Sequence, residues 1–218
     1  KVVISSPAKD DKVETFVIGV NSEDYKGEKI ISNASCTTNC IAPVMKILDD
    51  VFGIEKSLMT TIHSYTADQN LVDGPHKDLR RARAAGLNMI PTTTGAAIAS
   101  TKTIKNLKGK FDGLSIRVPT PVVSLADITA VVSKKVDIEM VNKVLSESAV
   151  TTHSKIVVCS DEPLVSSDLI KNPASAIVDL SLTQVVQGDL IKVVAWYDNE
   201  WGYSCRLAEM AVLVANDK

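Results

Sequence analysis

The sequence predicts an α+β fold, in which a mostly antiparallel mixed sheet carries helices on one face. In two places, strand-like, β-branched runs follow one another with only a short break. The first pair is 111–118 and 122–133, separated by a Pro-Thr-Pro sequence. The second pair is 176–186 and 190–197, where Gly188-Asp189 marks a hairpin turn.

Three stretches with helical apolar spacing predict the helices, at 36–52, 136–147 and 200–214. The first is the best delimited, because Ser35 is a suitable N-cap and Gly53 a suitable stop. A proline in its second turn removes one backbone hydrogen bond, so we expect a local irregularity there.

The first 35 residues predict short strands. Apolar runs at 2–4 and 15–20 predict two of them, and 29–33 predicts the end of a third. None of the ten glycines stands two positions from another, so the chain has no G-x-G-x-x-G turn. A dinucleotide would therefore not find its usual phosphate-binding loop here.

The composition is that of a globular protein. Of 218 residues, 45% are hydrophobic and 23% charged, with a net charge of −2, which argues against disorder and against a nucleic-acid-binding surface. No apolar run reaches the roughly 18 residues of a membrane span. Four cysteines without a dense disulfide pattern favour the cytoplasm, and their spacing with histidine predicts no metal site.

The segment 35–40, Ser-Cys-Thr-Thr-Asn-Cys, places a thiol in the first turn of the first helix. A free thiol has a pKa of about 8.5, and lowering it to about 6 takes roughly 3.4 kcal/mol. A helix N-terminus supplies about 0.3 to 1 kcal/mol, so a cation must supply the rest. The candidates are His63, His76 and His153. Without such a partner, both cysteines of the segment are simply small core residues.

His63 is the best placed of the three histidines. The alternating segment 57–65 predicts a strand with His63 near its end. The number of residues from Cys36 to His63 suits a chain that leaves a strand, forms a helix and returns as a second strand. We therefore expect the two side chains to meet above one sheet edge.

Other polar segments suit the binding of anions. Residues 91–97 join threonines and a glycine to a probable helix start, where backbone N–H groups can hold an anion. The long loop 66–90 carries several arginines, and Arg117 lies at the Pro-Thr-Pro break. A helix-capped thiol, a histidine and such turns point to an enzyme that forms a thioester on a phosphorylated or carboxylated substrate. The pattern alone does not choose between a cysteine hydrolase and a dehydrogenase.

Six blocks of the chain carry a resemblance to a known family. They are 35–40, 63–66 (His-Ser-Tyr-Thr), 78–83 (Asp-Leu-Arg-Arg-Ala-Arg), 91–97 (Pro-Thr-Thr-Thr-Gly-Ala-Ala), 117–121 (Arg-Val-Pro-Thr-Pro) and 196–203 (Trp-Tyr-Asp-Asn-Glu-Trp-Gly-Tyr). In order and spacing they resemble phosphorylating glyceraldehyde-3-phosphate dehydrogenase. The fold implied is that family's catalytic domain, preceded by the terminal strands of a truncated Rossmann domain.

The resemblance implies an NAD-dependent oxidoreductase of glycolysis that converts glyceraldehyde 3-phosphate and inorganic phosphate to 1,3-bisphosphoglycerate. Cys36 would be the nucleophile, and the product of oxidation would be its thioester. His63 would raise the thiolate population as an ion-pair partner and then accept the hydroxyl proton. The backbone N–H of Cys36 would join His63 in stabilising the oxyanion.

Two anion sites follow from the same resemblance. The substrate phosphate would lie on Thr66, Arg81 and Arg117. The attacking phosphate would lie on a second set, Ser35, Thr37, Thr94 and Gly95. Spacing alone does not separate Arg81 from the neighbouring arginines at 80 and 83.

The resemblance also implies a nicotinamide site and a homo-oligomer. Asn199 would bond the nicotinamide amide, and Tyr203 would pack beside its ring. Pro75, in a loop that reaches a neighbouring subunit in the family, matches members that prefer NAD.

Three segments are expected: 1–35 as a remnant of the dinucleotide-binding domain, 36–199 as the catalytic domain, and 200–218 as a helix that packs on the missing part. The chain alone should therefore bind NAD poorly, with its last helix exposed or displaced. Alternatives are erythrose-4-phosphate dehydrogenase and a noncatalytic fragment that dimerises.

Overall fold

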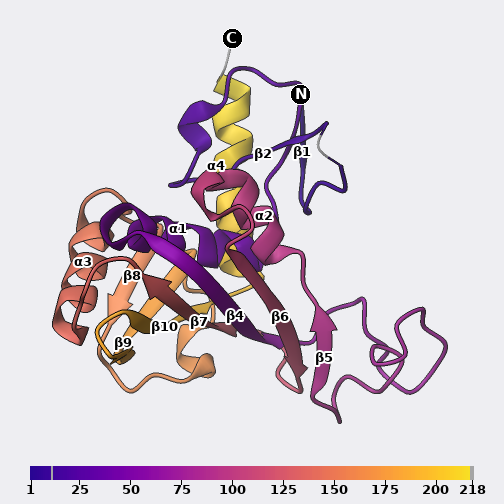
Figure 1. Ribbon diagram of the computed structural model, residues 1–218. Helices are drawn as coiled ribbons and strands as arrows, with labels where there is room; N and C mark the ends of the chain where they lie inside the picture. Colours follow the sequence, from indigo (N-terminus) through magenta and orange to yellow (C-terminus); the bar gives the residue numbers. More distant parts are fainter. Residues whose placement is uncertain (11, 217–218) are drawn as a thin grey trace.

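A computed structural model describes residues 1–10 and 12–216 and contains two sheets (Figure 1). The small sheet has strand order β1-β3-β2, and the large one has the order β5-β6-β4-β7-β10-β9-β8. The strands are β1 (Val2–Ile4), β2 (Glu14–Thr15), β3 (Ile30–Ser32), β4 (Ile54–Ser64), β5 (Ile90–Thr93), β6 (Phe111–Val118), β7 (Ser124–Val132), β8 (Val157–Ser160), β9 (Ala176–Val186) and β10 (Leu190–Tyr197). The helices are α1 (Cys36–Phe52), α2 (Ala96–Thr103), α3 (Ile138–Val150) and α4 (Trp201–Asn216), with 3-10 turns η1 (Ser22–Asp24), η2 (Lys105–Leu107) and η3 (Ser166–Leu169).

The large sheet is mixed and mostly antiparallel, as predicted. Its antiparallel pairs are β5–β6, β4–β7, β7–β10 and β10–β9, and its parallel pairs are β4–β6 and β8–β9. The hairpin of β9 and β10 turns through Gln187 and Gly188, both with positive φ. The small sheet is parallel.

Helices α1, α2 and α3 lie on one face of the large sheet, and α1 forms the centre of the core. It contacts β4, β7, β9 and β10, while α3 covers β8 and β9 and α2 packs on β6. Ile41, Met45 and Leu48 of α1 are fully buried, and each contributes about 2 kcal/mol of transfer free energy. None of the helices in the described residues is long and apolar enough to cross a membrane.

The strand predicted at 15–20 is wrong beyond Thr15. The backbone closes a turn instead, because Val17 O accepts from the N–H groups of Val20 and Asn21, at 3.0 and 3.2 Å. The Asn21 side chain completes the turn by accepting from Val17 N at 2.9 Å. Gly19, with φ +80°, supplies the left-handed residue that this turn needs.

The sequence did not indicate β5 and β8. Pro91 lies inside β5, and a proline counts against a central strand. It is accommodated because β5 is an edge strand, with β6 as its partner in the sheet. Strand β8 is short and lies at the opposite edge.

The last helix is packed, which corrects the expectation that it is exposed or displaced. Met210 and Val214 are buried in a cluster with Phe16 and Ile31, so α4 covers the small sheet. Figure 1 shows this unit on the side of α1 away from the large sheet. Of the predicted segment 200–218, residues 217 and 218 lie outside the described residues.

Close packing between β4 and β6 gives a stability prediction. A Cβ at Gly113 would lie 2.5 Å from Met59 O and 2.6 Å from Met59 Cγ. We expect Gly113→Ala to lower the free energy of unfolding by about 2 kcal/mol, measured by urea denaturation. The control is Gly86→Ala, since a Cβ there meets no atom within 4 Å. Equal denaturation midpoints for the two variants would contradict the prediction.

Candidate active site

Cys36 is presented by the capped N-terminus of α1. Ser35 is the N-cap, as predicted, and its Oγ accepts from Thr38 N at 3.1 Å. The preceding Ala34 has φ +56°, an unusual conformation for alanine, and its N–H donates to Ser32 Oγ at 3.0 Å. The chain therefore turns sharply from β3 into α1 immediately before the thiol.

The structure brings Cys36 and His63 together. Cys36 Sγ lies 3.5 Å from His63 Nε2, and His63 is 3% exposed near the end of β4. The expected position above one sheet edge is wrong, because β3 belongs to the small sheet and β4 to the large one. The pair forms where α1, which runs between the two sheets, begins.

Burial governs the protonation of both groups. It lowers the pKa of His63 to about 4, with a further lowering by the Arg117 guanidinium. Burial also raises the pKa of Cys36, while the N–H and hydroxyl of Thr37 and the charge of Arg117 act in the opposite direction. Burial thus favours a thiol beside a neutral imidazole, whereas the sequence predicted a thiolate beside an imidazolium.

Arg117 shares the other side of the histidine ring. Its Nη1 lies 2.7 Å from His63 Nδ1 and donates to Ser64 O at 3.2 Å. Ser64 O also lies 2.7 Å from Nδ1. One nitrogen cannot both donate to the carbonyl and accept from the guanidinium, so the two neighbours favour opposite tautomers. When Nδ1 donates to Ser64 O, the Nε2 lone pair faces Sγ and can accept its proton.

Tyr197 supports this arrangement from β10. Its hydroxyl lies 2.9 Å from Thr37 Oγ1 and 2.8 Å from Thr61 Oγ1. Its ring meets the ring of His63 edge-on, with centroids 5.9 Å apart. Sequence reasoning gave Tyr197 no role, although it lies in one of the six blocks.

The predicted set for the substrate phosphate is partly brought together, through a residue that the sequence did not indicate. Asp68 accepts from Thr66 Oγ1 with one oxygen and from Arg81 Nη1, at 2.8 Å, with the other. Arg81 Nη2 also donates to Thr93 O at 3.3 Å. Arg117 is linked to them electrostatically, since the Asp68 carboxylate opposes the lowering of its pKa by burial.

These contacts separate Arg81 from its neighbours. Arg83 pairs instead with Asp73 at 3.3 Å, and Arg80 is exposed. Arg81 is therefore the arginine of this run whose side chain reaches the neighbourhood of Thr66.

The second predicted anion set lies at the starts of α1 and α2, which pack on each other. Ser35 Oγ is 2.8 Å from Thr38 Oγ1, and the hydroxyl of Thr37 is engaged by Tyr197. Thr94 Oγ1 accepts from the N–H of Ala96 at 3.2 Å, and Gly95 is the residue before α2. Ser35 thus caps α1, whereas Thr37 bonds to Tyr197 and Thr94 bonds to a backbone N–H at the start of α2.

Two of the predicted cofactor residues flank the start of α4. Asn199 Oδ1 accepts from Ser64 Oγ at 2.9 Å and from Ser124 Oγ at 3.0 Å, and its Nδ2 lies 3.4 Å from Glu200 Oε1. Tyr203 donates its hydroxyl to Ala34 O at 3.0 Å, and burial raises its pKa to about 12. Tyr203 thus supports the turn that precedes Cys36.

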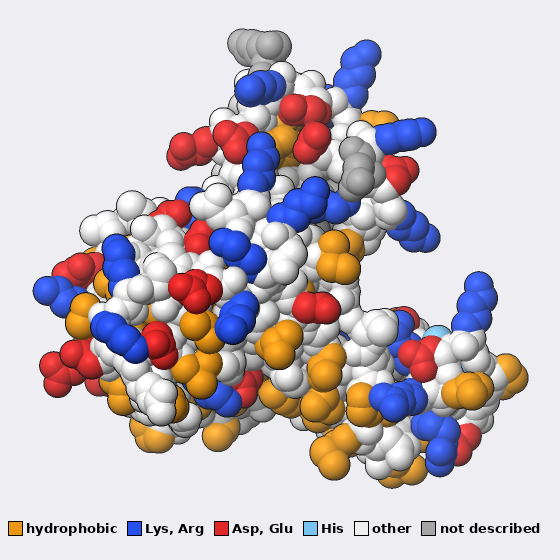
Figure 2. Space-filling view, in the orientation of Figure 1, with side chains coloured by type: hydrophobic (Ala, Val, Ile, Leu, Met, Phe, Trp, Pro, Cys, Tyr) orange, Lys and Arg blue, Asp and Glu red, His pale blue; other side chains and the backbone are white. Residues whose placement is uncertain are grey.

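Pro75 is the third predicted cofactor residue, and it lies in the loop 65–89. This loop is held by its own backbone, with Asn70 N donating to Arg81 O and Ala85 N to Asn70 O. It projects from the molecule beside β5 (Figure 1), and several of its exposed side chains are hydrophobic (Figure 2). These are Leu71, Val72, Leu79, Leu87 and Met89.

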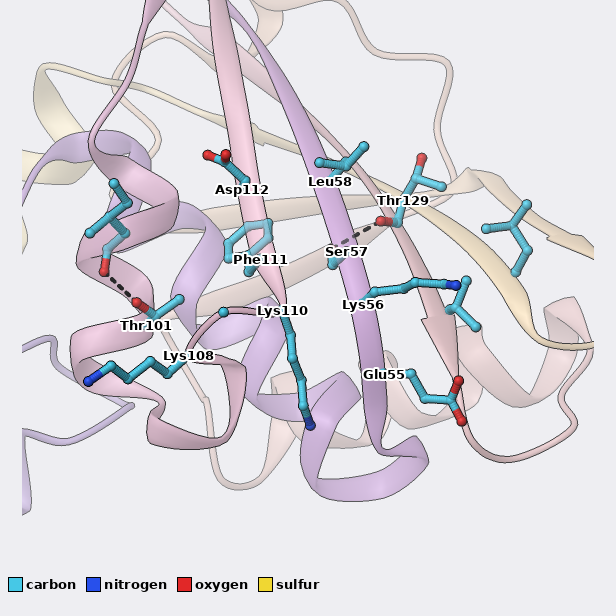
Figure 3. A pocket seen from close by; sticks show the side chains of 14 residues that line it. Glu55, Lys56, Ser57, Leu58, Thr101, Lys108, Lys110, Phe111, Asp112 and Thr129 are labelled. Carbon is cyan, nitrogen blue, oxygen red and sulfur yellow. Dashed lines mark hydrogen bonds between the residues drawn. The ribbon is translucent and has the colours of Figure 1, made fainter.

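A broad hollow lies elsewhere, over β4 and β6 (Figure 3). Leu58 and Phe111 contribute apolar surface, and Lys56, Lys108 and Lys110 contribute charge. None of the predicted site residues lines it. The chemistry of the thiol is therefore not located in this hollow.

Comparison with known proteins agrees with the resemblance. Residues 35–199 match the family described as "Glyceraldehyde 3-phosphate dehydrogenase, C-terminal domain". The chain is 54% identical to glyceraldehyde-3-phosphate dehydrogenase of Mycobacterium avium over 98% of its own length and 63% of that relative. It is also 54% identical to the chloroplastic glyceraldehyde-3-phosphate dehydrogenase A of Chlamydomonas reinhardtii, over 99% of the chain and 58% of the relative. The chain thus spans less than two thirds of the length of these relatives.

Proposed function

The chain belongs to the glyceraldehyde-3-phosphate dehydrogenase family, and from this we propose that it carries the catalytic thiol of an NAD-dependent oxidoreductase of glycolysis. The substrate is glyceraldehyde 3-phosphate, and the product is 1,3-bisphosphoglycerate, formed through a thioester on Cys36. The observation that carries the proposal is the 3.5 Å contact of Cys36 Sγ with His63 Nε2 at a helix N-terminus. The half-buried guanidinium of Arg117 and the hydroxyl groups beside this pair suit a phosphorylated substrate.

In this mechanism His63 moves the protons. Cys36 Sγ bonds to the aldehyde carbon while its proton passes to His63 Nε2 and then to the former carbonyl oxygen, giving a hemithioacetal. Nε2 next accepts the hydroxyl proton as the hemithioacetal is oxidised. Inorganic phosphate then attacks the thioester carbon, and Sγ leaves and regains a proton from Nε2. The backbone N–H of Cys36 and the imidazole stabilise the oxyanion.

Two groups of side chains bind the phosphates in this proposal. Arg117, Arg81 and Thr66 hold the substrate phosphate, which replaces the Asp68 carboxylate as the partner of Arg81 and Thr66. The hydroxyls of Ser35, Thr37 and Thr94 hold the attacking phosphate with the N–H of Gly95, at the starts of α1 and α2.

The residues around Asn199 fit a nicotinamide. Two serine hydroxyls occupy Asn199 Oδ1 and one amide N–H is directed to Glu200 Oε1, so the other N–H remains to donate to a carboxamide oxygen. Tyr203 lies at the same end of α4 and would pack beside the ring. NAD, when bound, supplies the hydride acceptor.

The remaining predictions are kept as part of the proposal. Residues 36–199 form the catalytic segment, 1–35 belong to a dinucleotide-binding segment, and the helix from 200 packs on that segment. Pro75 and the apolar loop around it reach a neighbouring subunit of a homo-oligomer. The four cysteines are unpaired, which suits the reducing cytoplasm.

The proposal is tested by mixing the chain with NAD, inorganic phosphate and glyceraldehyde 3-phosphate and following the absorbance of reduced nicotinamide. With the segment that precedes this one in the relatives added, we expect reduction that depends on phosphate and that Cys36→Ser abolishes. The chain alone should give little reduction, because it is expected to bind NAD poorly. Erythrose 4-phosphate, supplied as an alternative substrate, should react more slowly. Absence of turnover, also when the segment that precedes this one in the relatives is added, would contradict the proposal.

A further inference from the structure

Ser124 begins β7 in a strained and buried setting. The residue before it, Val123, has φ +70°, which is rare for a β-branched side chain. Val123 is buried in an apolar cluster with Leu169, Ala174 and Ile177. The surrounding packing therefore maintains this conformation, and Ser124 itself is only 2% exposed.

The Ser124 hydroxyl joins two other segments. It accepts from Ser64 N at 3.1 Å and donates to Asn199 Oδ1 at 3.0 Å. Ser64 Oγ closes the triangle by donating to the same Asn199 oxygen at 2.9 Å. The end of β4, the start of β7 and the segment after β10 are thus held together by side chains that are all buried.

Each end of this triangle meets a residue with a proposed role. Ser64 follows His63 directly, and its carbonyl lies 2.7 Å from His63 Nδ1. The residue whose carbonyl lies against the imidazole is therefore held at its own backbone N–H by Ser124. At the other end, the two hydroxyl donors orient the amide of Asn199 so that its N–H groups point away from them.

We infer that Ser124 is a positioning residue that fixes His63 through the Ser64 backbone and Asn199 through its amide oxygen. The inference rests on the proposed function, because one hydroxyl then supports both His63, the proposed base, and the amide of Asn199, which would bind the nicotinamide. Without that hydroxyl, the buried N–H of Ser64 has no hydrogen-bond acceptor, and the end of β4 is free to shift. The contact between Nε2 and Sγ then loosens.

The test is the rate at which iodoacetamide alkylates each cysteine of the whole chain, read by mass spectrometry. We expect Ser124→Ala to slow alkylation of Cys36 about tenfold at pH 7. The matched control is Ser115→Ala, a buried serine of β6 whose hydroxyl has no hydrogen-bond partner.

The other cysteines distinguish lost positioning from general loosening. Loosening would expose Cys40, which is fully buried, and raise its alkylation, whereas lost positioning lowers the rate at Cys36 alone. If Ser124→Ala does not fold, the pair Ser124→Thr and Ser124→Val replaces it. Threonine and valine have nearly the same shape, and only threonine has a hydroxyl. Threonine should then retain the rate that valine loses.

Two failures give different results. Equal alkylation of Cys36 and Cys159 in the unchanged chain would overturn the proposed function, and this inference with it. Selective alkylation of Cys36 that persists in Ser124→Ala at the rate of Ser115→Ala would overturn the role of Ser124 alone. Equal rates for the threonine and valine variants would do the same.

Discussion

Replacing His63 by asparagine should slow the alkylation of Cys36 by iodoacetamide roughly 100-fold at pH 7. In the unchanged chain Nε2 lies 3.5 Å from Sγ, and in the proposed mechanism it accepts the thiol proton as the sulfur attacks. Asparagine keeps a polar side chain of similar reach but has no basic nitrogen. Burial raises the pKa of the thiol, so without the base Cys36 has little thiolate at neutral pH.

The pH dependence of this effect follows from the low pKa of His63, about 4. Because the imidazole is protonated only below that value, it remains a base between about pH 5 and pH 8. We compare the rate of Cys36 alkylation in the unchanged chain with the rate in His63→Asn. The ratio of the first rate to the second should be constant over this range and decrease as the pH approaches 4. A ratio that already declines from pH 7 to pH 6 would contradict this prediction, because it would show that the pKa of His63 is close to that of a histidine in water.

The control for this experiment is His76→Asn. His76 lies in the loop 65–89, where its Nδ1 accepts from Asp78 N at 2.9 Å. Its replacement should leave the rate at Cys36 unchanged. If the two variants behave alike, His63 is not the base. Cys40, Cys159 and Cys205 should react slowly in all three proteins.

Replacing Asp198 by alanine should lower the free energy of unfolding by about 3 kcal/mol. The carboxylate is 2% exposed and accepts from three backbone N–H groups. Its Oδ1 caps α4 through Glu200 N at 3.0 Å and Trp201 N at 2.9 Å, and its Oδ2 accepts from Lys171 N at 2.7 Å. Alanine would leave these donors unsatisfied and would also release the loop before β9 from α4.

Urea denaturation of the whole chain measures this effect. The control is Asp168→Ala, because Asp168 accepts from Val165 N at 2.8 Å in an exposed turn, η3, and its loss should cost less than about 1 kcal/mol. Because the cap holds the start of α4, on which Cys205 lies, we also expect iodoacetamide to alkylate Cys205 faster in the Asp198→Ala variant. Equal stability of the two variants would contradict the role of the buried cap.

The sequence by itself determined the features that depend on neighbouring residues. Ser35 and Gly53 delimit α1 because a hydroxyl cap and a left-handed glycine act within one turn of the helix. The hairpin of β9 and β10 and the alternation of β4 were also predicted from local pattern. The six blocks indicated the family and the residues to examine, since each block is a short continuous segment.

The tertiary structure decided what depends on distant segments. Only packing shows that Asp68 joins Thr66 to Arg81 and that the Tyr197 hydroxyl bridges Thr37 and Thr61. It also placed β3 and β4 in different sheets and Pro91 in an edge strand, neither of which local pattern specifies.

The charge of the pair Cys36 and His63 shows the difference most directly. The sequence predicted an imidazolium beside the thiol, because a helix N-terminus alone cannot lower the pKa of a thiol far enough. In the folded chain the imidazole is removed from water and lies against Arg117, and both effects lower its pKa. A sequence names the titrating groups, but desolvation and the charges nearby depend on which parts of the chain meet in space.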